Sequence, residues 1–176
     1  IPESDCSGEF FSIDNSHLNI EGQSAMVMPT GSSMTVLSGV VMDLENARFS
    51  GSNNLMLRNC TVNIGQGGIF TEYGRDLCLE NSTVYIAKEA VMQSELCNIL
   101  LRDTAITNDG FFFISGWNEL QFSQQDSVIY NNGNAEICLP NDLTGESMIY
   151  NKGVLYTSPD HLIDSERIDG NAQKTS

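Results

Sequence analysis

Hydrophobic and polar residues alternate along the middle of this chain in a pattern that repeats every 21 or 22 residues. Four copies begin at apolar residues: Leu55, Leu77, Ile99 and Leu120. A fixed period of this length is typical of repeat architectures, in which each unit packs against its neighbours in the chain. The period therefore predicts a stack of similar units from residue 55 onward.

Each copy contains three short apolar segments separated by polar or glycine-containing turns. The first segment alternates strictly, as in Leu55 and Leu57, which is the pattern of a strand with one buried face. A second alternation follows, as in Val62 and Ile64, and then a third apolar run, as at 69–70. Three short strands closed by turns within one period predict a single coil of a solenoid.

The polar segments argue against helical repeats. They are rich in Gly, Asn, Ser and Thr, which favour turns. They also lack the helix segment and the LxxLxLxxN signature of leucine-rich repeats. Stacked β-coils would instead bury their inward side chains in continuous columns, and would pair each backbone edge with a coil about 4.8 Å away. The sequence therefore predicts one all-β solenoid domain over residues 1–176.

The repeated L-x-L-x-[N/D]-x-x-[VI] units over residues 11–142 resemble those of the right-handed parallel β-helix family, which includes pectate lyases, polygalacturonases and phage tailspikes. In that family an asparagine ladder lines the turn between the second and third strands. The residues that match this ladder are Asn15, Asn59, Asn81 and Asp103. The resemblance implies the fold but little about activity, because this fold hosts many chemistries.

About six coils are expected between residues 11 and 142, including two less regular copies that precede Leu55. Residues 1–10 are expected to cap the first coil. An uncovered end strand would otherwise pair with other chains, which makes such a cap necessary in a solenoid.

The repeat fails after residue 142, where a C-terminal cap is expected over 143–176. The apolar runs at 148–150 and 154–156 flank Asn-Lys-Gly and predict a hairpin with a glycine-containing turn. Ser158 followed by proline predicts the start of a short helix over 159–168. Hairpin and helix together would close the open end of the solenoid.

The 176 residues include 23 acidic and 8 basic side chains, so the net charge is −15. This charge argues against nucleic-acid binding, which uses a basic stripe. No apolar run reaches membrane-spanning length, and the start has no signal-peptide pattern. Because the chain begins at Ile1 rather than Met, we expect a processed or excised exported protein, located extracellularly or at a cell surface. The resemblance implies a bacterial or phage origin.

Two further motifs have structural explanations. The chain has five cysteines: Cys6, Cys60, Cys78, Cys97 and Cys138. They are odd in number and share no metal-ligand spacing, so we expect mostly free thiols. Asn59-Cys-Thr and Asn81-Ser-Thr match the N-glycosylation motif. A solenoid turn that favours Asn followed by Thr explains the same residues, and we prefer that explanation.

Arg58, Glu80 and Arg102 fall at the same place in three successive copies, after the inward leucines. At the spacing of stacked coils they predict an outward column of alternating charge. The two arginines could also grip an anionic sugar. A solvated salt-bridge column is the interpretation that we favour.

The third apolar segment contains two adjacent columns. One comprises Ala25, Ala47, Ile69, Val91 and Phe113, and the other comprises Met26, Arg48, Phe70, Met92 and Ile114. Neighbouring strand residues face opposite sides, so one apolar column must lie outside unless a bulge shifts the register. We therefore expect an interface stripe along Met26, Phe70, Met92 and Ile114, covered by the chain's own C-terminal segment, by a second subunit or by a ligand.

Glu72, Tyr73 and Trp117 follow this segment in neighbouring turns. Exposed aromatic rings beside a carboxylate suit stacking against sugar rings. In enzymes of the resembling family the substrate groove runs along an outer face of the coils. These three residues form the candidate ligand-binding site, although isolated aromatic residues in turns are also common packing residues.

Few side chains in the sequence match a known catalytic arrangement. His17 and His161 lie in separate contexts without a matched nucleophile and acid. Glu72 and Glu95 fall in successive coils, but so acidic a chain must contain some carboxylate pairs by chance. Lyases of the resembling family use calcium-binding aspartates and an arginine base. No cluster here matches that motif, so we predict no catalytic residue, no metal ligand and no cofactor, and calcium is left as an alternative that no residue pattern supports.

The sequence therefore favours a non-catalytic surface or secreted module that presents a rigid face for adhesion, with a glycan or a protein as its partner. A polysaccharide lyase or glycoside hydrolase, complete or cut down, is the first alternative, although these coils lack the long insertions that wall the cleft in family enzymes. An oligomeric spike or shaft segment, with the apolar stripe as its subunit seam, is the second.

Overall fold

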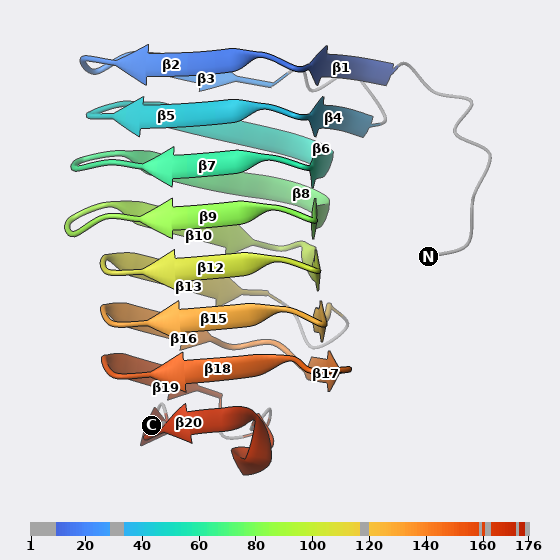
Figure 1. The fold of residues 1–176 in the computed structure, drawn as a ribbon, viewed down its shortest axis with the longest axis vertical. Coiled ribbons are helices and arrows are strands. Elements are labelled where there is room, and N and C mark those ends of the chain that lie inside the picture. Colours follow the sequence, from blue (N-terminus) through green and yellow to red (C-terminus); the bar gives the residue numbers. More distant parts are fainter. Residues whose placement is uncertain are drawn as a thin grey trace.

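The chain winds around one axis in short strands, and each coil lies directly beneath the previous one (Figure 1). The computed structural model describes residues 10–28, 34–116, 120–158, 160, 163–171 and 173–174. In these ranges strands from successive coils pair in parallel, from β1 with β4 near the start to β19 with β21 near the end. The fold is a right-handed parallel β-helix.

Each coil has three faces, named face 1, face 2 and face 3 in the order in which the chain passes through them. Face 2 is an eight-stranded sheet. Its strands are β2 (His17–Glu21), β5 (Val41–Glu45), β7 (Thr61–Ile64), β9 (Thr83–Ile86), β12 (Ala105–Asn108), β15 (Val128–Asn131), β18 (Met148–Asn151) and β20 (Ile168–Gly170).

Faces 1 and 3 together form a thirteen-stranded sheet, because two long strands run from face 3 into face 1 without a break. These two strands are β6 (Arg48–Arg58) and β8 (Ile69–Glu80). Face 1 also contains β1 (Phe10–Asp14), β4 (Met34–Ser38), β11 (Asn98–Arg102), β14 (Phe122–Gln125) and β17 (Asn141–Thr144). Face 3 also contains β3 (Ala25–Val27), β10 (Val91–Glu95), β13 (Phe111–Ser115), β16 (Asn134–Ile137), β19 (Val154–Thr157) and β21 (Gln173–Lys174).

The inward side chains stack in register and form the core. On face 1, Leu57 pairs with Leu79 and Leu79 pairs with Leu101, and none of the three is more than 1% exposed. A coil has no core of its own, so burial of these columns between coils is what stabilises the fold. The fourth copy aligns differently from the prediction, since Phe122 rather than Leu120 pairs with Ile99.

One residue with a left-handed backbone makes the turn from face 1 to face 2 in each coil. These residues are Asn15, Gly39, Asn59, Asn81, Asp103, Asp126 and Gly145, with φ between 46° and 64°. Asn, Asp and Gly tolerate this conformation better than other residues do. The expected ladder thus exists as a column, and the Asn81 side chain donates to Asn59 Oδ1 at 2.6 Å. Its members are exposed, however, so the ladder serves the turn rather than the core.

A second asparagine ladder, which was not predicted, is buried in the core. Asn108 Nδ2 donates to Asn131 Oδ1 at 2.7 Å, and Asn131 Nδ2 donates to Asn151 Oδ1 at 2.6 Å. These residues end the face 2 strands, in the inward column that Ile64 and Ile86 occupy higher in the stack. The signal in the sequence is Asn-x-Gly, which recurs at 108–110, 131–133 and 151–153.

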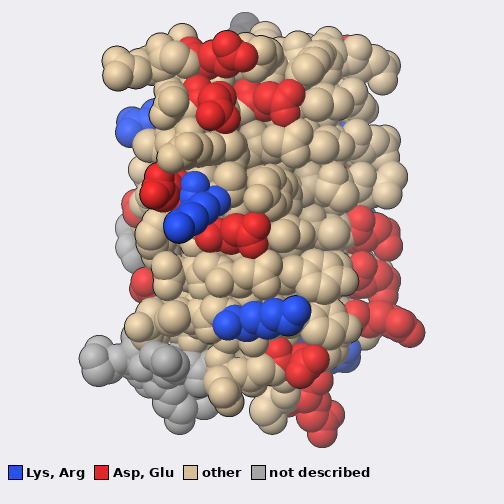
Figure 2. All heavy atoms as spheres, turned by 60° about the vertical axis from the view of Figure 1, so that its left-hand side comes forward, with Lys and Arg blue, Asp and Glu red and all other residues tan. Residues whose placement is uncertain are grey.

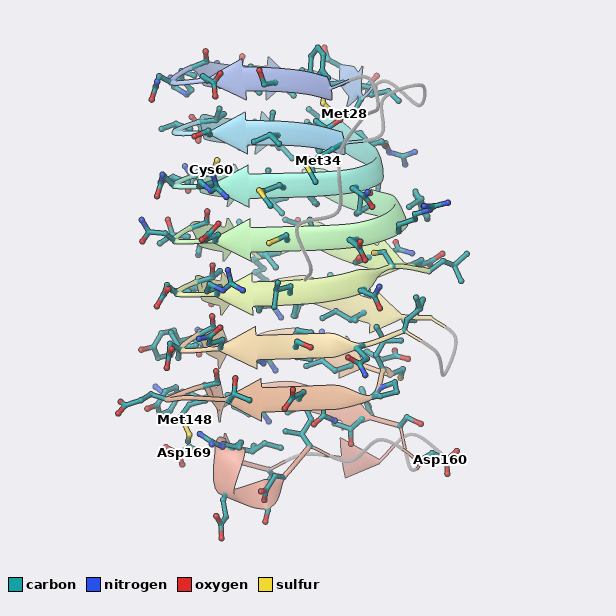
Figure 3. All side chains as sticks on the ribbon, turned by 90° about the vertical axis from the view of Figure 1, so that its right-hand side faces the viewer. Met28, Met34, Cys60, Met148, Asp160 and Asp169 are labelled. Atoms are coloured by element: carbon teal, nitrogen blue, oxygen red, sulfur yellow. The ribbon has the colours of Figure 1, made fainter. Side chains whose placement is uncertain are left out.

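Small hydroxyl or thiol side chains follow the left-handed residue and bond to neighbouring coils. The column consists of Cys60, Ser82, Thr104, Ser127 and Ser147. The Ser82 hydroxyl accepts from the Cys60 backbone N–H at 3.0 Å, and the Cys60 thiol donates to the carbonyl of Leu37. Cys60 lies at the edge where face 1 turns into face 2 (Figure 3). The four described cysteines are all unpaired, as expected.

The C-terminal segment extends the stack instead of closing it with a hairpin. β18 pairs in parallel with β15, and β19 pairs in parallel with β16, so the runs at 148–150 and 154–156 are consecutive strands of one more coil. Asn-Lys-Gly is an ordinary turn of this solenoid. A Cβ on Gly153 would lie 2.1 Å from the carbonyl oxygen of Gly133, so the glycine permits close stacking of two coil turns.

The expected helix is reduced to one short turn. It is the 3₁₀ helix η1 (Ser165–Arg167), and the backbone N–H of Glu166 donates to Asp164 Oδ1 at 3.1 Å. The chain then enters β20, where the prediction placed the end of a helix. Residues 159 and 161–162 lie outside the described residues, and so does the expected N-terminal cap apart from residue 10.

Candidate functional site

The charged column on face 1 is present as expected. Arg58 Nε donates to Glu80 Oε2 at 3.0 Å, and an Arg102 nitrogen lies 3.8 Å from the other oxygen of Glu80. All three side chains are partly exposed, which makes such pairs worth little in stability. Because Glu80 lies between the two arginines, it offsets one of the two positive charges that could attract an anionic sugar.

The prediction that Met26, Phe70, Met92 and Ile114 form an exposed interface stripe is wrong. Phe70, Met92 and Ile114 face inward and are buried, while Met26 is half-buried above Phe49. Phe70 pairs with Met92, and Ile114 lies two residues after Phe112, the partner of Met92, so all three belong to the inward side of face 3. The turn before Phe49 is one residue shorter than the turn before Phe70, so Phe49 rather than Arg48 is the partner of Phe70.

Apolar side chains do lie outside on face 3, one position away. Ile69 pairs with Val91 and Val91 pairs with Phe111, all pointing outward and partly exposed. Phe113 lies on the same side and stacks on Phe111, with ring centroids 6.0 Å apart. The described C-terminal strands stack at the end of the solenoid rather than over this column.

Glu72 and Tyr73, two of the three candidate sugar-binding residues, face opposite sides of β8. Tyr73 is 49% exposed, but Glu72 is completely buried, and Trp117 lies outside the described residues. Glu72 was placed in a turn, whereas β8 continues through it and directs it inward. The pairing also separates Glu72 from Glu95, since Glu72 lies beside Ser94 while Glu95 lies beside Tyr73.

Exposed tyrosines instead form a column on face 2. The outward column runs through Asn19, Asp43, Asn63, Tyr85, Thr107, Tyr130, Tyr150 and Asp169. Tyr85, Tyr130 and Tyr150 are 42%, 44% and 36% exposed. The rings of Tyr130 and Tyr150 stack with centroids 5.2 Å apart, and Thr107 separates Tyr85 from Tyr130. This column was not predicted, because each tyrosine is an ordinary outward residue of its own strand.

Neighbouring polar groups form hydrogen bonds with Tyr85 and Asp43 of this column. The Tyr85 hydroxyl donates to Asp109 Oδ2 at 3.0 Å, which raises the pKa of Tyr85, and Asn132 Nδ2 donates to the other oxygen of Asp109 at 2.8 Å. Higher on the same face, hydrogen bonds from Asn63 and from His17 lower the pKa of Asp43. The column is therefore polar in its first three coils, contains tyrosine in the fourth, sixth and seventh, and ends at Asp169.

Other surface features offer weaker sites. A shallow groove of about 330 Å³ follows the left-handed turn past Asn81, Asp103 and Asp126. No group of three or more His, Cys, Asp or Glu side chains in the described ranges could hold a metal ion. Acidic side chains gather in a vertical row along one edge of the molecule, while uncharged residues fill most of the side that faces the viewer (Figure 2).

Only one of the two histidines lies in the described part of the chain. His17 Nε2 lies 2.5 Å from Asp43 Oδ2 on the exposed surface, and His161 lies outside the described residues. No described helix is long and apolar enough to cross a membrane. Comparisons with protein-family models, curated proteins and solved structures find no match to this chain.

Proposed function

We propose that this protein is a non-catalytic binding module, secreted or displayed at a cell surface, that presents face 2 to a glycan chain. The tyrosine column Tyr85, Tyr130 and Tyr150 is the observation that carries the proposal. Tyrosine offers a flat apolar ring with a polar edge, which suits the C–H faces and hydroxyls of a sugar. The three rings line up along the solenoid axis, so an extended chain of sugars would run along that axis.

The scaffold supports this role because it is rigid. Face 2 strands are paired with the coil above and the coil below, and every inward side chain of the column behind the tyrosines is buried in the middle coils. A preorganised surface loses little conformational entropy when a ligand binds. Shallow stacking contacts can therefore give useful affinity without a deep pocket.

Charge narrows the ligand class. The net charge of −15 opposes the approach of polyanionic glycans at ordinary ionic strength. The carboxylates of Asp43 and Asp109 flank the tyrosine column and accept hydrogen bonds from their own neighbours. A neutral polysaccharide with many hydroxyl groups is the partner that this face fits best.

The second candidate function is an oligomeric shaft segment. It is favoured by the outward apolar column of Ile69, Val91 and Phe111 on face 3. A subunit seam along this column would bury those side chains. The two functions use different faces, so both could operate in one protein.

A polysaccharide lyase or hydrolase remains the competing proposal, and the structure gives it less support. Glycoside hydrolysis needs two carboxyl groups that face one groove. Glu72 is buried and faces the core, while Glu95 lies on the opposite side of its strand. Release of reducing ends from a polysaccharide panel would revive this reading.

A panel of neutral oligosaccharides tests the glycan proposal. We expect the native protein to bind at least one of them, and Tyr130→Ala or Tyr150→Ala to weaken that binding at least tenfold. Tyr73→Ala, which removes an exposed tyrosine from the other long sheet, is the matched control and should bind normally. Equal loss in the control, or no binding by the native chain, would contradict the proposal.

A further inference from the structure

Glu72 is a carboxyl group enclosed in the core of the solenoid. It points inward from β8, between Gly51 of β6 and Ser94 of β10, and its exposure is 0%. Neither of its oxygens has a hydrogen-bond partner among the residues that the structure describes. Carboxyl groups are almost never buried without a partner, because the lost hydration is not replaced.

Gly51, in the coil above, leaves the space that the Glu72 side chain occupies. A Cβ built on Gly51 would lie 1.6 Å from Glu72 Oε2 and 2.8 Å from Cδ2 of Leu55. The carboxyl group therefore occupies the notch that the missing side chain of Gly51 leaves in the coil above. Any residue larger than glycine at position 51 would have to displace it.

The groups that face Glu72 do not compensate a negative charge. Ser94 and Cys97 lie on the next coil, and their hydroxyl and thiol are hydrogen-bonded to each other at 2.6 Å. Burial is the main reason that the pKa of the Cys97 thiol rises to about 11, so the thiol is neutral. On the side of face 1, the apolar side chain of Leu55 borders the same notch. The charged groups that act on Cys97 are Glu72 itself and Asp76, and both are acidic and raise the pKa of the thiol.

An uncompensated site of this kind favours the protonated acid. Burial raises the pKa of Glu72 from 4.5 to about 8, and no charged neighbour contributes to the shift. The packed edge therefore holds one proton more than an opened edge would hold, at every pH between these two values.

The buried carboxyl group lies beside two exposed apolar side chains. Tyr73 follows it directly, and Leu96 of the next coil is also exposed. Leu96 has a left-handed backbone with φ of 60°, a conformation that is uncommon for leucine. Strained residues of this kind persist only where the surrounding packing holds them.

We propose that Glu72, seated in the Gly51 notch, is a proton-dependent lock on the edge formed by Tyr73 and Leu96. At acidic pH the neutral carboxyl group packs inside and holds this edge closed. As the pH rises, opening becomes easier because the opened edge can release the proton to water. The proposal does not depend on glycan binding by face 2.

Hydrogen exchange of the native protein at pH 5.5, 6.5 and 7.5 tests the lock. Exchange rates of amides at 70–74 and 92–97 are divided by the intrinsic chemical rate at each pH. We expect their protection to fall about tenfold per pH unit, since opening releases one proton. Amides of β12 and β15, which lie away from Glu72, are the internal control and should keep constant protection.

Glu72→Gln, which keeps the shape but cannot ionise, should abolish the pH dependence of the same amides. Infrared spectroscopy of the native protein at pH 6.5 supplies a readout that needs no variant. A protonated carboxyl band should be present at that pH and disappear as the pH passes about 8. Absence of the band at pH 6.5, or equal pH dependence in both groups of amides, would overturn the proposal.

Discussion

Gln124 lies directly beneath Leu101 in the inward file of face 1, and it is as deeply buried as the leucine. Neither its amide nitrogen nor its amide oxygen finds a hydrogen-bond partner within the described ranges. Leu143 follows in the next coil, so the amide is placed between two apolar side chains. The Gln124 amide thus interrupts a column of inward apolar side chains without forming a hydrogen bond that would offset its burial.

Replacement of this group should stabilise the protein. We expect Gln124→Leu to raise the free energy of unfolding by about 1–3 kcal/mol, the usual penalty of an unsatisfied buried polar group. Urea unfolding measures the change. Gln125→Leu, at the exposed neighbouring position, should stay within about 0.5 kcal/mol of the native value. A destabilised Gln124→Leu variant would show that the amide has a partner after all.

Substitution in the buried asparagine ladder should destabilise the protein. Asn131→Ala removes the acceptor of Asn108 and the donor to Asn151, so two buried amides lose a partner. We expect a loss of about 2–4 kcal/mol in the free energy of unfolding. Asn132→Ala, one residue further on and exposed, removes only a surface bond to Asp109 and should cost less than about 1 kcal/mol. Similar costs for the two variants would contradict the ladder.

Glu72 should make stability fall as the pH rises. Its pKa is about 8 in the folded protein against 4.5 for the free side chain, so the folded state binds the extra proton between these values. The free energy of unfolding should therefore decrease by about 1.4 kcal/mol per pH unit in that window, relative to Glu72→Gln. Urea unfolding of both proteins at pH 5.5 and pH 7.5 gives the comparison. A constant difference between them would exclude a raised pKa.

The pairing of Glu72 with Gly51 can be measured by a double-mutant cycle. Gly51→Ala should destabilise the native chain by about 1–3 kcal/mol, because the new methyl group collides with the carboxyl group. In a Glu72→Ala background the same substitution should cost less, since the main obstacle is gone. Equal costs in the two backgrounds would mean that the notch is not shaped by Glu72.

Much of the fold was predictable because the 21- or 22-residue period shows which residues, far apart in the sequence, pack together. Leu57, Leu79 and Leu101 recur at one spacing, and only a stack of coils brings all three to one place. The left-handed turns were also predictable, since Asn59 and Asn81 belong to the small group of residues that tolerate this backbone.

The predictions that were wrong, and the features that were not predicted, have local causes in the sequence. Asn-Lys-Gly at 151–153 looks like a hairpin turn, because only the strands beyond it decide whether the next pairing is antiparallel or parallel. The outward column of face 3 was misplaced because neighbouring residues such as Ile69 and Phe70 are both apolar, so the alternation alone does not decide which of them faces the core. Tyr130 and Tyr150 carry no motif, so their column could be recognised only after the coils were stacked.

The most direct test of the whole account is the proximity of the three leucines in a protein with labelled leucine methyl groups. Nuclear Overhauser contacts should link Leu57 with Leu79 and Leu79 with Leu101, and none should link Leu57 directly with Leu101, two coils or about 10 Å away. Resolved signals from all three residues without these two contacts would contradict the stacked solenoid, and with it both proposals built on its faces.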